Sequence, residues 1–217
     1  MLDATLLTLV HLLVFAYWLG GDIGAFYAAG FLTRDGVPRD RRLFAAKMLG
    51  DIDMAPRTAI ILAFPTGFAL AAAKGWITAP AGAVAAVAAG ALAWLAVVWR
   101  LHLKAGADEI LRTVDTIVRW SALVAIAGFG AVGLAGVLDL PLFVVLKSFA
   151  LAVTIACGLA IRAVAAPLGP AFAKLAAGDD DDAISAVRGV MAKARPLVLA
   201  IWATLVVAAW LGIAVPT

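Results

Sequence analysis

The sequence has little charge and almost no cysteine. Asp, Glu, Lys and Arg make up 14% of the 217 residues, whereas 65% are apolar. An ordinary soluble domain has roughly 25% charged and about 45–50% apolar residues. The composition therefore excludes a soluble globular domain and predicts an integral membrane protein. The single cysteine, Cys157, excludes an internal disulfide and a metal site built on cysteines.

The short motifs of soluble enzymes are also missing. The sequence contains no GxxxxGK[ST] phosphate loop, no dinucleotide fingerprint after a strand, no HExxH and no GxSxG. No basic residue precedes the first apolar run, Ala4 to Leu32, so we expect this run to be a retained helix rather than a signal peptide. The net charge of +3 comes from short loops between apolar runs, so we expect no nucleic-acid partner.

Apolar runs long enough to cross a bilayer recur along the whole chain. A spanning helix needs about 20 mostly apolar residues. In lipid only helices and closed barrels can span, and these runs lack the alternating apolar and polar pattern of barrel strands. We predict an all-α fold, one polytopic bundle over residues 1–217 in a lipid bilayer. Its six transmembrane helices are expected at 4–31, 57–74, 81–101, 120–138, 142–163 and 196–214.

Basic residues gather on one side of these spans. Six Lys or Arg lie in 32–57, four in 100–119 and five in 162–195, whereas the opposite loops carry only Lys74. By the positive-inside rule, this asymmetry predicts that both termini face the periplasm of a bacterial inner membrane. The basic segments 38–54 and 108–118 also carry spaced apolar residues, which favours helices that extend past the bilayer or lie on its surface.

Ionisable residues within the spans are the candidate functional residues, because each is costly in lipid. His11 and Lys147 each lie about two turns from the outer end of their helix, roughly 8–10 Å deep, and are expected to share one pocket. His102 belongs to the inner end of its span, so one haem held by both histidines is not expected. A structural role for His11, as a satisfied polar residue, stays open.

Asp22 lies about 16 Å deeper than His11, near the expected start of the second span. We expect it to pair with Arg57, whose guanidinium would be costly alone in lipid. A proton or substrate path through Asp22, Asp51 and Asp53 is the alternative.

Aromatic residues and a proline complete the candidate pocket. Tyr17 and Trp18 would line a site for a planar cofactor, although an aromatic helix face is also typical of packing. Pro65 removes a backbone donor and is expected to kink the second span, which can open a cavity or simply fit a neighbouring helix.

Two segments, VHLLVFAYWLGG (10–21) and LFVVLKSFAL (142–151), resemble the CopD and HemJ-like group of small polytopic membrane proteins. For HemJ-like proteins the resemblance implies haem b and oxidation of protoporphyrinogen, with His11 as axial ligand and Lys147 as a functional residue. The chain departs from that pattern at Gly21-Asp22, where HemJ-like chains have an arginine. YWLGGDIGAFY and DIDMAPR are more similar to a family of bacterial integral membrane proteins without an assigned activity.

CopD-like members imply copper uptake, but the four methionines form no ladder of the soft ligands that Cu(I) prefers.

These observations leave three hypotheses for the function. The first is a haem b membrane oxidoreductase, in which His11 binds the iron, Lys147 pairs with a propionate or an anionic substrate, and a partner chain or a weak ligand takes the sixth position. The second is a transporter that uses Asp22, Arg57 and Lys147. The third is a non-catalytic membrane subunit or assembly factor, within a homo-oligomer or beside a partner chain.

Overall fold

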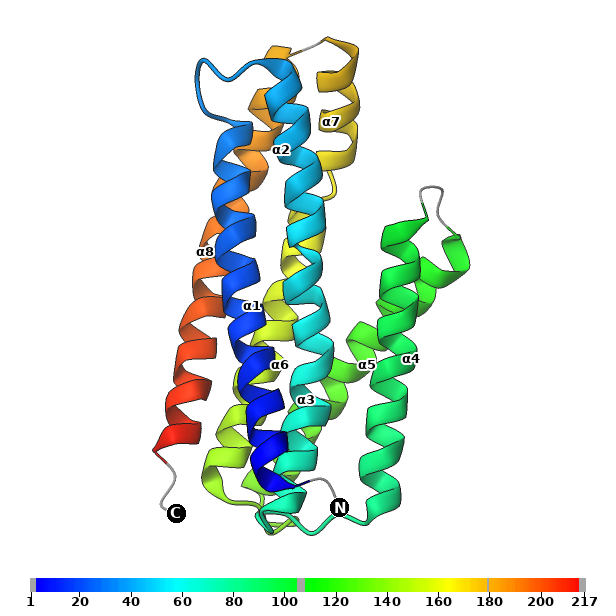
Figure 1. Ribbon diagram of the computed structural model, residues 1–217, viewed down its shortest axis with the longest axis vertical. Coiled ribbons are helices and arrows are strands. Elements are labelled where there is room, and N and C mark those ends of the chain that lie inside the picture. The colour runs from blue at the N-terminus through cyan, green and yellow to red at the C-terminus, as the bar shows by residue number, and fades with distance from the viewer. Residues whose placement is uncertain (1–2, 105–107, 179, 215–217) are drawn as a thin grey trace.

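The computed structural model describes residues 3–104, 108–178 and 180–214, and its regular structure is entirely helical over these residues. Figure 1 shows an elongated bundle in which α1 begins and α8 ends at the same end. We call this the terminal end, and the opposite end, which carries the α1–α2 connection and α7, the loop end. The helices are α1 (Ala4–Leu32), α2 (Arg39–Ile52), α3 (Met54–Ala73), α4 (Ala81–Leu103), α5 (Glu109–Leu134), α6 (Leu142–Val164), α7 (Leu168–Ala177) and α8 (Asp180–Ile213).

The expected six spans are present. In the described part of the chain, six helical stretches are long and apolar enough to cross a membrane, so the protein is a multi-pass membrane protein. Several helices are longer than the apolar windows, because the amphipathic basic segments continue them. α8 has 34 residues, or about 51 Å, whereas the hydrocarbon core of a bilayer is about 30 Å thick. Its first turns therefore project beyond the lipid at the loop end.

The projecting helix ends pack on one another at the loop end. Leu32, Ala45, Ala171 and Val187 form a small apolar cluster that joins α1, α2, α7 and α8. Buried Arg42 fastens the α1–α2 turn, because its guanidinium donates to the carbonyl oxygens of Leu32, Arg34 (2.7 Å) and Val37 (3.0 Å). This end is thus a folded extension of the bundle.

Within the membrane, neighbouring helices form a closed ring in the order α1, α3, α4, α5, α6, α8 and back to α1. The short turns at the terminal end join α3 to α4 and α5 to α6, as the loop lengths predict (Figure 1). Close approach of α1 and α3 depends on Gly21, where an added Cβ would lie 2.5 Å from the Cβ of Ala55. Val14, Trp18, Ala59, Ile201 and Leu205 form the core between α1, α3 and α8.

Candidate functional site

A cavity of about 420 Å³ opens the terminal half of the ring, between α1, α3, α5, α6 and α8. This volume falls within the roughly 300–1,000 Å³ of small-molecule sites. Three residues of the central core, Val14, Trp18 and Leu205, also line the cavity and close it toward the middle of the bundle. Its other aromatic walls are Phe15, Phe64, Phe68, Trp76, Phe129 and Phe143.

His11 lines this cavity and is held in one orientation by α3. Its Nδ1 lies 2.9 Å from the hydroxyl oxygen of Thr66, and that hydroxyl donates to the carbonyl oxygen of Leu62 at 2.7 Å. Because the single hydroxyl proton is given to Leu62, Thr66 accepts and His11 Nδ1 donates. The Nε2 lone pair of neutral His11 then has no hydrogen-bond partner in the described part of the chain. A ligating histidine fixed by its other nitrogen has this arrangement.

The ring of His11 packs against the Pro65-Thr66-Gly67 segment of α3. A Cβ at position 67 would lie 3.1 Å from Cε1 of His11, so only glycine leaves the ring its full space. Pro65 lies inside α3, as predicted. The roles of Thr66 and Gly67 were missed from the sequence, although a hydroxyl and a glycine beside an intramembrane proline are the signal that could have found them.

Lys147 lines the same cavity, so the structure brings the two expected residues together. Lys147 Nζ lies 2.5 Å from where a Cβ on Gly212 would be, so the ammonium group occupies the space that this glycine leaves on α8. Over the residues that the structure describes, Nζ has neither a hydrogen bond nor an ion pair.

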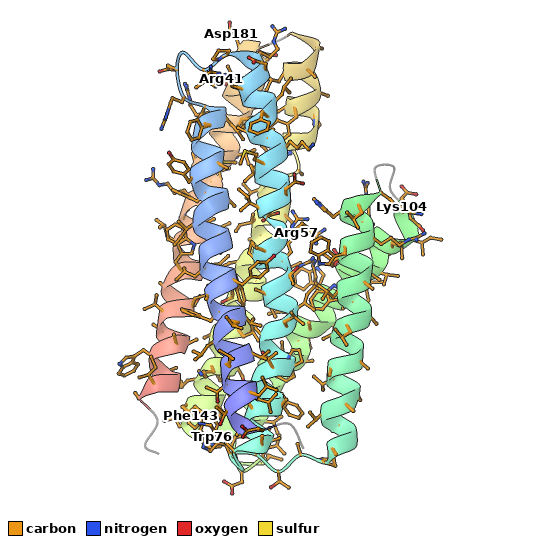
Figure 2. All side chains as sticks on the ribbon, viewed as in Figure 1. Arg41, Arg57, Trp76, Lys104, Phe143 and Asp181 are labelled. Atoms are coloured by element: carbon orange, nitrogen blue, oxygen red, sulfur yellow. The ribbon has the colours of Figure 1, made fainter. Side chains whose placement is uncertain are left out.

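The charged groups of the cavity are all basic. Lys74 lines its rim and lies over the indole ring of Trp76 at 4.9 Å, and Trp76 meets the ring of Phe143 edge to face at 5.0 Å. Figure 2 shows Trp76 and Phe143 together at the terminal end. No carboxylate from the described residues lines the cavity. An apolar chamber with two ammonium groups suits an anionic amphipathic ligand.

Of the two aromatic residues expected at the site, only Trp18 lines the cavity, and it is 3% exposed. The expectation for Tyr17 is wrong, because its side chain is 51% exposed and lies outside the lining. The reason is helical geometry. Residues seven apart share a face, as His11 and Trp18 do, whereas a spacing of six turns the side chain roughly 120° away.

The expected pairing of Asp22 with Arg57 is also wrong. Arg57 pairs instead with Asp53, one helical turn earlier, and its Nε donates to Oδ2 at 2.6 Å. Asp22 Oδ2 is buried without a hydrogen-bond partner among the described residues, and it faces the indole of Trp202, whose Nε1 is likewise unpaired. Neither Asp22 nor Arg57 lines the cavity.

His102 lies outside the cavity, as its position predicts. Its Nε2 is 3.4 Å from Oδ1 of Asp51, and its ring meets Trp99 edge to face. Two of the three acids considered for a proton path, Asp51 and Asp53, are therefore engaged with basic partners.

A second polar cluster was missed from the sequence. Asp115 is 1% exposed, and its Oδ2 accepts from Nε of Arg119 at 3.0 Å and from Nη1 of Arg162 at 2.7 Å. Its Oδ1 accepts from the indole of Trp94 at 2.9 Å. One carboxylate thus ties α4, α5 and α6 together. The i, i+4 spacing of Asp115 and Arg119 was the available signal, but both were assigned to a basic loop.

Comparison with protein-family models, with curated proteins and with solved structures finds no match for this chain. Among the described residues, no group of three His, Cys, Asp or Glu side chains is placed to hold a metal ion. The polar side chains that line the cavity are one imidazole, two ammonium groups and the hydroxyls of Thr8, Ser148, Thr154 and Thr204.

Proposed function

We propose that the protein binds haem b in the terminal cavity, with a role in electron transfer or oxidoreduction. One observation supports the proposal: His11, whose Nε2 has no hydrogen-bond partner among the described residues, lines the same cavity as Lys147, whose ammonium has no partner there either. The helix α1 histidine and the later lysine are the residues for which the resemblance to HemJ-like proteins implies function.

The residues present fit haem better than a bare metal ion. A single imidazole is a poor site for a naked metal, whereas haem iron already has four porphyrin nitrogens and needs only axial ligands from the protein. The aromatic and aliphatic walls suit the flat apolar face of a porphyrin. Lys147 and Lys74 give the cavity two positive charges, which match the two propionates of haem b.

Each residue has a defined part in this assignment. Bound haem would supply one-electron redox chemistry. Thr66 holds the tautomer in which Nε2 of His11 could bind the iron, and Lys147 would pair with a propionate or an anionic substrate. His102 lies outside the cavity, so any second ligand would be a weak one or would come from a partner chain, which includes a second copy in a homo-oligomer.

We further propose that the protein lies in the bacterial inner membrane with its terminal end toward the periplasm. The loop-end segments carry fifteen of the seventeen basic residues, which is the asymmetry of a cytoplasmic side. The cavity would then be reached from the periplasmic half of the membrane.

The test is an absorption titration of purified protein with haem b. Wild type is expected to give a Soret band at 1:1 stoichiometry, and His11→Ala is expected to lose it. Lys147→Gln keeps the band but is expected to bind about 10–150-fold more weakly, since a charge-assisted contact contributes about 1.5–3 kcal/mol. Tyr17→Ala, on the outer face of α1, is the matched control and should bind like wild type. Protein that stays colourless with ample haem would refute the proposal.

A further inference from the structure

The Asp115 cluster has more positive than negative charge. One carboxylate oxygen serves both Arg119 and Arg162, so the three side chains carry a net charge of +1. Arg57, on the side of α3 that faces α4 and α5, is close enough to Arg119 for the two charges to repel, but its own partner is Asp53 (Figure 2). The surplus charge therefore belongs to Arg119 and Arg162.

Donors on both arginines remain unused. Arg162 gives only Nη1 to Asp115, and its side chain is 41% exposed, so it is partly accessible. Arg119 gives only Nε to Asp115, its side chain is 10% exposed, and its guanidinium lies 5.4 Å from the ring centre of Trp94. Among the described residues no second carboxylate takes these donors. Asp115 and Trp94 thus hold two guanidinium groups in place, and each guanidinium keeps N–H donors that no described carboxylate accepts.

Arg162, at the end of the cluster nearest the loop end, lies at the depth of lipid headgroups. Arg162 is about 20 residues along α6, so it lies about 30 Å from the start of that helix, which is the thickness of the hydrocarbon core. It is on the loop end, where the basic residues predict the cytoplasmic leaflet with its anionic lipids. Planar guanidinium groups bind phosphate oxygens in pairs of parallel hydrogen bonds.

We propose that Arg162, with the positive charge of buried Arg119 beside it and both held by Asp115, forms a binding site for the phosphate of an anionic lipid headgroup between α5 and α6 at the loop end. Asp115 acts here as a positioning residue, because it fixes both guanidinium groups without meeting the phosphate. This site is separate from the terminal cavity and does not depend on haem.

The test measures lipid binding to delipidated protein by native mass spectrometry. Phosphatidylglycerol and phosphatidylethanolamine with the same acyl chains are titrated into wild type, Arg162→Gln and Arg112→Gln. Arg112 lies on the same helix as Arg119 and is exposed without an ion pair in the described chain, so it is the matched control. Inorganic phosphate and glycerol 3-phosphate are added as soluble competitors, which separates a lipid from a free phosphate compound.

We expect wild type and Arg112→Gln to bind phosphatidylglycerol about ten-fold more tightly than phosphatidylethanolamine, and Arg162→Gln to lose this preference. Arg162→Lys, which keeps the charge but not the planar fork, is expected to fall between them and covers the case in which Arg162→Gln folds poorly. Competition at millimolar phosphate would assign the same site to a soluble phosphate. Equal binding of both lipids to wild type without competition, or equal behaviour of Arg162→Gln and Arg112→Gln, would overturn the proposal.

Discussion

Replacement of Asp115 by asparagine is expected to destabilise the protein strongly. The carboxylate is 1% exposed and accepts three hydrogen bonds of 2.7–3.0 Å, two of them from guanidinium groups. Asparagine keeps an acceptor for Trp94 but leaves Arg119 and Arg162 without a counter-charge. Breaking a buried ion pair on one side costs about 3–5 kcal/mol. At about 2–4 °C per kcal/mol for a chain of this size, the expected fall in Tm is about 6–20 °C.

The assay is thermal unfolding in one detergent, followed by intrinsic tryptophan fluorescence and by helical circular dichroism. Asp51→Asn is the matched control, because Oδ1 of Asp51 lies 3.4 Å from Nε2 of His102 and its side chain is 59% exposed. Exposed pairs contribute about 0–1 kcal/mol, so its Tm should fall by no more than about 4 °C. A Tm for Asp115→Asn within about 2 °C of that for Asp51→Asn, the smallest gap between the two expected falls, would refute a buried clamp between α4, α5 and α6.

Two further predictions concern the packing and the tautomer. Gly21→Ala should lower the Tm, because the new Cβ would meet Ala55 and overpacking costs about 1–3 kcal/mol. The control Gly20→Ala, with no neighbouring atom within 4 Å, should leave the Tm unchanged or raise it. Equal Tm shifts for the two variants would show that α1 and α3 do not approach closely at Gly21. Thr66→Val should weaken haem binding about 10–100-fold, because Nδ1 of His11 loses its acceptor, while Thr66→Ser should bind like wild type; unchanged affinity in Thr66→Val, measured by Soret titration, would contradict the assigned tautomer.

The sequence was sufficient to predict the six spans and the shared depth of His11 and Lys147. Both follow from run length and helical rise, which lipid enforces strongly. The pairing of Asp22 with Arg57 failed because a local partner, Asp53, lies one turn away on the same chain segment and needs no particular helix rotation. Depth along a helix can be counted from sequence, but its rotation about its axis depends on packing.

The Asp115 cluster was missed for a similar reason, because its contacts depend on how separate helices pack. Its four members come from three helices, and only the Asp115–Arg119 spacing is local. The helix α5 begins at Glu109, well before the apolar window, so the pair lies inside the bundle rather than in a loop. A search for apolar windows therefore misses buried polar residues that lie on the amphipathic extensions of spanning helices.

Chemical rescue of His11→Gly measures the central claim most directly, namely that the imidazole of His11 binds haem iron in the terminal cavity. The glycine variant with haem b is expected to lack the Soret band of wild type, and added imidazole is expected to restore it, since the cavity keeps its walls and Lys147. A wild-type spectrum in His11→Gly without imidazole would contradict ligation by His11. Failure of wild type itself to bind haem would contradict the assignment of this cavity to haem b.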